Sequence, residues 1–502
     1  MAALAYAGYV GTWAWQSIMA DYPMEYRENS ALFTSALQLE GKNPYSVEQR
    51  PLHVNLFGPG YHWISYPAVR LFGNSYKTLR LVSVAFVMAS CALLVWGLRI
   101  DRCPWWAAVS GGLLLFGQLG QGLSITARPD ALGLFLLLAS LVIPYRYRFS
   151  PRSLAVSAVF SIFGYLTKPY FVLGLPLVCL FVFLCQNKFK ALVYGLAGTI
   201  GLLLSLLATN AVYECYLTET FVAQHNLVQR SYEHLVKVGG QFLRDNLGWS
   251  AMLAGGFVSW MRIRRDTTLR ASRSGRPWFS DLKAPMLSVA IPFPAVILGG
   301  NAAAMVLALG LNPGNDVLYY HQLISPFLLW LALVVVGQHS RWQSVWLLVL
   351  LANIMWLGFQ APKWPQDQSG AWSDLDRLIA SHRHVFTAPH LSHLLVRHGL
   401  PAYDSGQTEY VLCAFKNNPA RVVSEYYQRT QAFFEDIQTK VVNEQFDLVL
   451  VCRRLGPLIP WGDLETHYVC KGPLPAPMAF GYWVDSYPLE AWVPRSQIEP
   501  SK

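Results

Sequence analysis

The sequence predicts a multi-pass α-helical membrane protein that ends in a small C-terminal α/β domain. Of its 502 residues, 53% are hydrophobic and only 14% are charged, whereas soluble domains carry about 25% charged residues. Charge-free runs recur up to residue 362, and many of them reach the roughly 20 residues that a bilayer requires. These runs predict about eleven transmembrane helices in residues 1–362, followed by a separate domain in residues 363–502.

The predicted spans alternate in direction, and the basic residues show which ends face the cytoplasm. Lys and Arg gather after the second, fourth, sixth, eighth and tenth spans, and short basic links of this kind stay in the cytoplasm. The net charge of +10 is therefore a topology signal rather than a nucleic-acid surface. The predicted spans are Ala2–Ala20, Leu81–Leu98, Pro104–Ala127, Ala131–Tyr145, Ser153–Thr167, Pro169–Asn187, Ala191–Tyr213, Asn246–Met261, Ala284–Asn315, Val317–Ser340 and Trp342–Pro362.

On this topology the long links 21–80 and 214–248 lie outside the cytoplasm, together with the tail. The link 21–80 contains two predicted helices, SALFTSALQLEGKNPY and YHWISYPAVRLFGNS, and the second has the aromatic character of a helix in the membrane interface. The tail alternates strands and helices. Its predicted strands are HVFTAP, AYDSG, FDLVLV and LEAWVP, and its predicted helices are HLSHLLVRHG and NPARVVSEYYQRTQAFFEDIQTKVVNE.

The eight cysteines predict no metal site, because no spacing among them resembles a zinc site. Cys452 and Cys470 in the tail are a candidate disulfide pair in an oxidising compartment.

Two charges stand where the fourth span begins, in the stretch SITARPDALG. The run after Asp130 is only ~22 Å long as a helix, shorter than the ~30 Å apolar core of a bilayer. Arg128 and Asp130 are therefore expected at the outer boundary of the membrane. Pro129 suits a first helical turn, where the helix dipole favours the Asp130 carboxylate. The functional interpretations are metal binding, a general base or an ion pair in a site; mutual neutralisation is the structural alternative.

Lys168 precedes Pro169 at the start of the sixth span and returns to the same face as Asp130. A cation at a helix N-terminus opposes the dipole, unless an anion binds between them. Backbone N–H groups and a lysine then form a phosphate site. The alternative is a lysine that snorkels to the interface.

Further candidates lie in the outer links. Glu28 opens an amphipathic stretch after the first span and is a candidate base, with a solvated helix start as the alternative. Tyr320 and His321, at the outer end of the tenth span, are candidate substrate ligands, although an aromatic belt also explains the tyrosines there. Weaker candidates are His225, Asn226, Arg230, Asp316 and Tyr319.

This set of groups at a lipid boundary suits a phosphate-activated sugar carried on a long lipid. The phosphate leaves readily if a cation stabilises its growing charge, and a carboxylate takes the proton of the acceptor hydroxyl. Direct attack inverts the anomeric centre. We predict Glu28 as the base, Asp130 as the second acidic group, and Arg128 with Lys168 as phosphate ligands. No cofactor is predicted to be required, and the requirement for a divalent cation stays open.

The motifs REN, FGPGYHW…RLFGNS…LRLVS, ARPDAL and YLTKP, in this order, resemble the GT-C membrane glycosyltransferases. They are closest to the branches related to protein O-mannosyltransferases and lipid A aminoarabinose transferases, families 39 and 83. The resemblance implies a GT-C fold, a polyprenyl-phosphate sugar donor and a glycan, lipid or protein acceptor. It matches Glu28, Asp130 and Lys168 to active-site positions and Arg128 to an Arg-x-Asp variant. The Lys-Pro-Pro frequent in the family is replaced by Phe57-Gly58-Pro59-Gly60.

The resemblance implies a bacterial inner or plasma membrane, with the active site on the extracytoplasmic face. Two other functions stay open: a non-enzymatic lipid or solute transporter, and a polysaccharide polymerase or ligase with a lipid-linked donor. Transporters usually show repeated halves and broken helices at the midplane, whereas these charges gather at one edge. Polymerases and ligases rely on arginine-rich outer loops, and the link 214–248 contains only Arg230 and Arg244.

Overall fold

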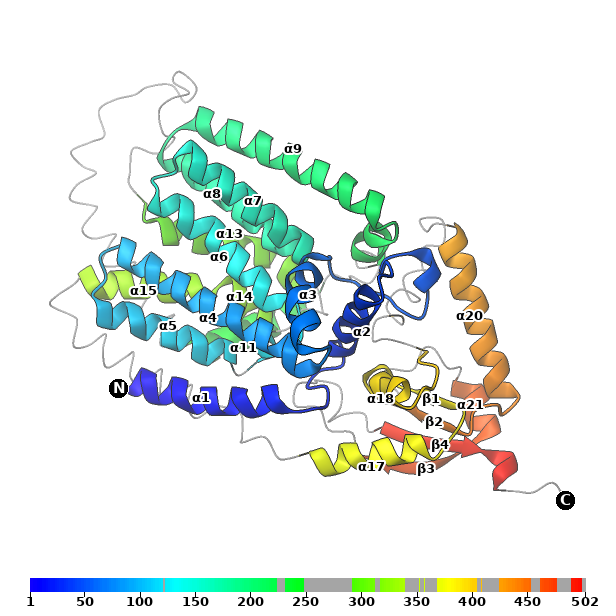
Figure 1. Cartoon of the computed structure of the whole chain (residues 1–502). Helices are drawn as coiled ribbons and strands as arrows, with labels where there is room; N and C mark the ends of the chain where they lie inside the picture. The colour runs from blue at the N-terminus through cyan, green and yellow to red at the C-terminus, as the bar shows by residue number, and fades with distance from the viewer. Residues whose placement is uncertain are drawn as a thin grey trace, which may run out of the picture.

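The computed structural model shows a helical bundle and a small mixed α/β domain, with the segment that follows helix α1 (Ala2–Met19) between them (Figure 1). The two parts differ in size: the bundle takes most of the chain up to residue 338, and the small domain begins at residue 368. The structure describes residues 1–120, 122–223, 231–247, 291–311, 317–338, 352, 356, 368–403, 408, 424–452, 461–475 and 489–498.

The bundle is built from helices that pack side by side (Figure 1). Its members are α1 (Ala2–Met19), α4 (Tyr76–Ile100), α5 (Trp105–Gly120), α6 (Asp130–Arg146), α7 (Pro151–Thr167), α8 (Gly174–Cys185), α9 (Lys188–Val212), α11 (Tyr232–Asp245), α13 (Phe293–Leu307), α14 (Val317–Leu323) and α15 (Ser325–Gln338). Arg99, Arg146 and Lys188 lie at one end, which we call the basic end. The opposite end, where α6 begins and α7 finishes, is called the site end.

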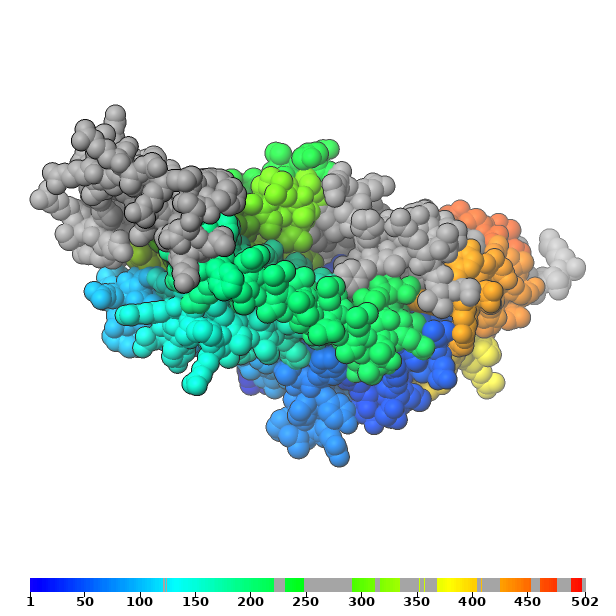
Figure 2. All heavy atoms as spheres, turned by 90° about the horizontal axis from the view of Figure 1, so that it is seen from above, coloured from blue at the N-terminus to red at the C-terminus, as the bar shows by residue number. Residues whose placement is uncertain are grey.

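The count of membrane spans is still a prediction. In the described part of the chain, three helices are long and apolar enough to cross a membrane: Tyr76–Ile100, Lys188–Val212 and Phe293–Leu311. Helices α14 and α15 add a fourth candidate, bent by 43°, if they form one span. Most exposed side chains of α9 are apolar, as with Leu203 and Leu207, and Figure 2 shows this helix in green along the outside of the bundle. Two predicted spans, Asn246–Met261 and Trp342–Pro362, lie almost wholly outside the described residues.

One predicted span is shorter than expected. The run Pro104–Ala127 was expected to form one helix, but α5 ends at Gly120, and a short 3-10 turn, Leu123–Ile125, follows. Glycine at positions 120 and 122 favours this ending, because glycine has the highest entropic cost in a helix among non-proline residues. The early ending leaves Ala127 and Arg128 outside any helix at the site end.

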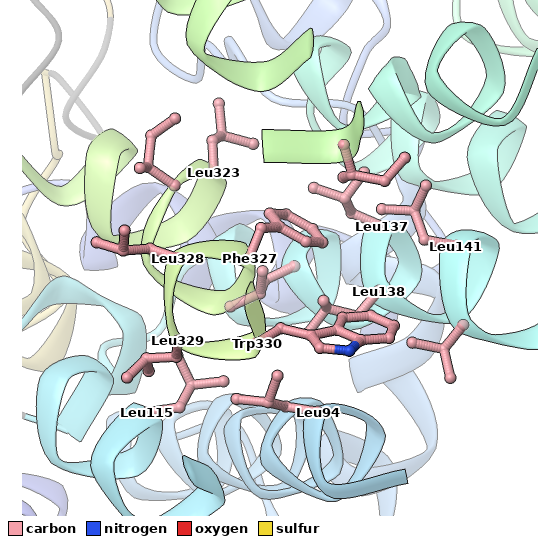
Figure 3. Close-up of a cluster of buried hydrophobic side chains, with 14 of the residues drawn as sticks. Leu94, Leu115, Leu137, Leu138, Leu141, Leu323, Phe327, Leu328, Leu329 and Trp330 are labelled. Carbon is pink, nitrogen blue, oxygen red and sulfur yellow. The ribbon is translucent and has the colours of Figure 1, made fainter. Parts of the chain in front are cut away.

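The bundle core is a continuous cluster of leucine and aromatic side chains from α4, α5, α6 and α15 (Figure 3). Trp330 of α15 is fully buried in it and packs on Gly97, where an added Cβ would lie 2.6 Å from the indole ring. Towards the basic end, Asp101 accepts hydrogen bonds from Tyr145 Oη at 2.5 Å and Trp330 Nε1 at 2.6 Å. These contacts join α4, α6 and α15 at the end opposite the site end.

The segment after α1 folds as α2 (Glu28–Leu39), the 3-10 turn η1 (Val47–Gln49) and α3 (Gly60–Phe72). Both helices predicted there are confirmed. Helix α3 buries Tyr61 and Val69 and exposes Leu71 and Phe72, which are 76% and 77% accessible. An exposed apolar face of this kind agrees with the predicted position in a membrane interface.

The small domain holds a four-stranded mixed sheet of order β1-β2-β4-β3. Strands β1 (Val385–Thr387) and β2 (Leu448–Val451) are parallel, and β4 (Leu489–Pro494) is antiparallel to both β2 and β3 (Tyr468–Leu474). Around the sheet lie α17 (Ser369–Ala380), η7 (Pro389–Leu391), α18 (Ser392–Arg397), α20 (Ser424–Val442), α21 (Trp461–His467) and η9 (Arg495–Gln497).

The sequence predicted part of this domain, with several differences. Strand β3 and the helices α17 and α21 were not predicted, and β3 carries Gly472 and Pro473, which usually interrupt strands. The expected strand AYDSG is not formed at Ala402 and Tyr403, and its other residues lie outside the described part. Cys452 and Cys470 remain thiols, which contradicts the suggested disulfide.

Candidate active site

Three predicted site residues meet at the site end of the bundle. Asp130 opens α6, and Lys168 follows the last residue of α7 in an extended conformation that its neighbour Pro169 favours. Lys168 Nζ donates to Asp130 Oδ1 at 2.8 Å, and Arg128 Nε lies 3.0 Å from Asp130 Oδ2. All three side chains are buried. The prediction that these charges converge from separate helices agrees with this geometry, and we call Arg128, Asp130 and Lys168 the charged cluster.

Aromatic and amide side chains complete the surroundings of the charged cluster. Tyr170 Oη donates to Asp130 Oδ1 at 3.2 Å and to Gln322 Oε1 at 3.0 Å as alternative acceptors. Lys168 Nζ also donates to Tyr319 Oη at 3.1 Å. The ring of Phe57 lies over the same ammonium, 5.0 Å from ring centroid to Nζ. Such a wall excludes water and strengthens every electrostatic interaction inside it.

A further carboxylate, which the sequence prediction passed over, faces the charged cluster from the segment after α1. Glu25 Oε2 lies 3.8 Å from Arg128 Nη1 and accepts the backbone N–H of Arg27 at 3.0 Å. Burial raises the pKa of Glu25 above its ordinary value of 4.5, while Arg128 and Arg27 oppose that shift. Glu25 is therefore a more basic carboxylate than a solvated glutamate, and it lies next to the arginine of the cluster.

The charges of the charged cluster and its neighbours Glu25 and Arg27 do not cancel. Among the described residues, Arg27, Arg128 and Lys168 bring three positive charges, and Glu25 and Asp130 bring two negative ones. The Nε and Nη1 atoms of Arg128 are buried and make no hydrogen bond within the described part of the chain, because the close approach to Asp130 is poorly aligned. Buried donors without acceptors are costly, so this arrangement suits an anion with several oxygens.

Glu28 lies beside the charged cluster, but its own oxygens are completely paired. Its two oxygens accept from Arg80 Nε at 2.8 Å and Nη2 at 2.7 Å, and also from the backbone N–H groups of Met24 at 2.6 Å and Ala127 at 2.7 Å. Arg80 in turn donates to the carbonyls of Ser17, Ala20 and Tyr22. Glu28 thus joins α2, α4 and the loop before Arg128 and has no lone pair left for a proton from a substrate.

The other predicted residues lie away from the charged cluster or outside the described residues. The ring of Phe242 on α11 contacts Tyr320 and His321, at centroid distances of 5.4 Å and 5.5 Å. His321 Nδ1 also lies 3.4 Å from Ser325 Oγ. Their neighbours Tyr319 and Gln322 are the residues of α14 that reach the charged cluster and Tyr170. The weaker candidates Asp316, His225, Asn226 and Arg230 lie outside the described residues.

The residues around the charged cluster do not form a cation site in their present arrangement. Glu25 and Asp130 each face arginine or lysine, and no group of three or more His, Cys, Asp or Glu side chains suits a metal ion in the described part of the chain. A divalent cation would require these ion pairs to open.

Comparison with known proteins identifies the fold. No protein-family model matches the sequence, and no curated protein matches it. The chain is similar to the crystal structure of ArnT from Cupriavidus metallidurans bound to undecaprenyl phosphate, with a TM-score of 0.60, 13% identity and 99% of each chain covered. It is similar to the apo state of the same protein, with a TM-score of 0.55, 14% identity and 99% of each chain covered. This similarity shows the fold over the whole chain.

Proposed function

Because the chain has the GT-C fold, we propose that it is an integral-membrane glycosyltransferase. It moves a sugar from a polyprenyl-phosphate carrier to a glycan, lipid or protein acceptor, with inversion at the anomeric carbon. The observation that carries this proposal is that the buried Arg128 has unsatisfied N–H groups at Nε and Nη1 within the described part of the chain, beside the second buried cation Lys168. The ligand of the similar ArnT structure, undecaprenyl phosphate, has the chemistry that such a cluster accepts.

In this mechanism Arg128 and Lys168 hold the oxygens of the lipid phosphate. The acceptor oxygen forms the new bond to the anomeric carbon, the old bond to the phosphate oxygen breaks, and the electron pair leaves with the polyprenyl phosphate. The two cations stabilise the charge that grows on this leaving group. Asp130 orients Lys168 through the 2.8 Å contact between its Oδ1 and the Lys168 Nζ.

The proton of the acceptor passes to a carboxylate in the segment after α1. The sequence motif favours Glu28, whereas the contacts favour Glu25, since the Glu28 oxygens are occupied by Arg80 and two backbone N–H groups. We assign the base to Glu25 and give Glu28 the task of holding this segment against α4. The raised pKa of Glu25 supports the assignment, because a general base works best when its pKa approaches the operating pH.

The site end faces the extracytoplasmic side in this proposal. Support comes from the opposite end of the same helices, where Arg99, Arg146 and Lys188 follow the positive-inside rule. The small domain then lies outside the cytoplasm and next to the acceptor. This orientation belongs to a bacterial inner or plasma membrane.

The test uses purified full-length protein in lipid nanodiscs, with undecaprenyl phosphate as the probe. Lys168→Met is expected to weaken binding of the probe by at least about tenfold, because a charged hydrogen bond to the phosphate is lost. Arg128→Gln should weaken it similarly, and binding is measured on the folded fraction of each variant, because each change also breaks a buried ion pair with Asp130. Lys42→Met is the matched control, since Lys42 is an exposed lysine that pairs with Glu40.

Two results would contradict the proposal. One is that wild-type protein binds the phosphate no better than Lys168→Met. The other is that wild-type protein, given lipid-linked sugar donors and membrane acceptors, never releases free polyprenyl phosphate, which is the behaviour of a transporter. A polymerase or ligase would release the carrier phosphate too, and mass spectrometry of the product would identify repeated addition.

A further inference from the structure

A second buried ion pair lies outside the charged cluster, where three parts of the chain meet. Glu219, in the one-turn π-helix η4 (Thr218–Ala223), pairs with the guanidinium of Arg50 through both oxygens, and its Oε2 lies 2.6 Å from Nη2. Both side chains are fully buried. Tyr426 of α20 donates its hydroxyl to Glu219 Oε1 at 2.9 Å. Glu219 thus joins the segment after α1, the end of α9 and the small domain.

The carboxylate of Glu219 is also connected to Phe57, through Asn55. The backbone N–H of Asn55 donates to Glu219 Oε2 at 3.3 Å, and the Asn55 side-chain oxygen accepts the N–H of Phe57 at 3.0 Å. Asn55 is buried, and its amide nitrogen also reaches Thr34 Oγ1 at 3.1 Å and His62 Nε2 at 3.0 Å. Asn55 therefore has little freedom to move independently of Glu219.

Phe57 in turn is fixed against the charged cluster. Its ring lies 5.0 Å from Lys168 Nζ and 6.0 Å from Arg128 Cζ, and its carbonyl accepts the hydroxyl of Tyr45 at 2.7 Å. The next residue is Gly58, where an added Cβ would lie 1.9 Å from the carbonyl oxygen of Leu166. The backbone at Gly58 therefore touches the end of α7 that presents Lys168, which fixes the ring over both cations.

We propose that Glu219 is a positioning residue that couples the docking of α20 to the phosphate site. The chain of contacts runs from Tyr426 through Glu219 and Asn55 to Phe57. The ring of Phe57 positions the side chains of Arg128 and Lys168 and shields them from water. The small domain then supports the geometry of the phosphate site and does not only cover it. The effect on donor binding at the phosphate site, which we call the catalytic half of this inference, rests on the proposed function. The structural coupling between Tyr426 and Phe57 does not.

The coupling is tested on the full-length protein with Tyr426→Phe, which leaves the Arg50–Glu219 pair intact. Hydrogen exchange of the backbone amides of Asn55 and Phe57, followed by mass spectrometry, reports the coupling directly. We expect exchange there to become about tenfold faster, the size of effect that loss of a hydrogen bond to a carboxylate produces. Unchanged exchange would overturn the inference.

The matched control is Tyr468→Phe. Tyr468 is also a buried tyrosine of the small domain, and its hydroxyl accepts from the N–H of Phe446 at 3.2 Å, away from Glu219. It is expected to leave exchange at Asn55 and Phe57 at the wild-type rate. Equal acceleration by both variants would overturn the inference, because it would show general loosening of the domain.

The catalytic half is tested by donor kinetics in a double-mutant cycle of Tyr426→Phe and Phe57→Leu. Each single variant should raise the donor KM about fivefold with a smaller change in kcat, and the double variant should be no worse than Phe57→Leu alone. Additive effects would overturn the route through Phe57. If wild-type protein neither binds undecaprenyl phosphate nor transfers sugar while the exchange coupling is present, the proposed function and the catalytic half fail, and the structural coupling stands.

Discussion

Glu28 and Asp130 are two buried carboxylates that look alike until their hydrogen bonds are compared. Each opens a helix, each is fully buried, and each is paired with a buried arginine. Around Glu28 the Arg80 donors and two backbone N–H groups are all used. Around Asp130, the Nε and Nη1 of Arg128 lack partners in the described part of the chain. Complete pairing is typical of a structural ion pair, and incomplete pairing indicates a binding site.

The largest effect expected from this comparison is on stability. Glu28→Gln leaves Arg80 buried opposite a neutral amide, and breaking a buried ion pair costs about 3–5 kcal/mol. The variant should unfold at a much lower temperature in detergent, or accumulate poorly. The folded fraction should still bind undecaprenyl phosphate as the wild type does. A stable Glu28→Gln protein that has lost only sugar transfer would instead make Glu28 the base.

The next effect is on catalysis alone. Glu25→Gln removes the carboxylate that we assign as base, and a positioned general base contributes at least about a hundredfold to the rate. Melting temperature should fall less than in Glu28→Gln, because Glu25 faces Arg128 and Arg27 only at 3.8 Å and 3.6 Å. Affinity for the lipid phosphate should not fall, because the change removes a negative charge beside Arg128. Turnover of a lipid-linked sugar donor measures the loss, and normal turnover would return the assignment to Glu28.

The sequence could identify the charged cluster but not the difference between the two carboxylates. Asp130 and Lys168 are conspicuous because they interrupt apolar runs next to prolines. Arg80 stands just before a charge-free run, where it marks the boundary of a span, and nothing near it in the sequence indicates its partner. Glu25 and Glu28 lie three residues apart, and only the coordinates show which of them faces Arg128.

Residues that pair across long distances in the sequence could not be predicted from the sequence around them. Tyr426 and Glu219 are 207 positions apart, and neither occurs in a motif. The helices of the bundle were predictable because a long apolar run in a chain of this composition indicates a membrane helix. The end of α5 was not, because the apolar run continues past Gly120 while the helix does not.

The pH dependence of transfer gives a further test of the Glu25 assignment. A base must be deprotonated to act, so the rate falls as pH drops through its pKa. Burial raises the pKa of Glu25, against the opposing charges of Arg128 and Arg27, and Glu28 raises it further. The acidic limb of kcat/KM for the donor should therefore lie above pH 4.5. The residual activity of Glu25→Gln should lack this limb, and an unchanged limb would show that another group titrates.

The smallest effect, and the sharpest contrast, comes from replacing each arginine with lysine. Arg80 uses its planar fork to make two bonds to Glu28 and further bonds to three carbonyls, a geometry that lysine does not reproduce. Arg128 is held by charge more than by hydrogen bonds, so Arg128→Lys should cost less stability than Arg80→Lys. Thermal unfolding of the two variants in parallel measures this difference. Equal losses would mean that the two arginines have the same structural role, and the unpaired donors of Arg128 would then no longer indicate a binding site.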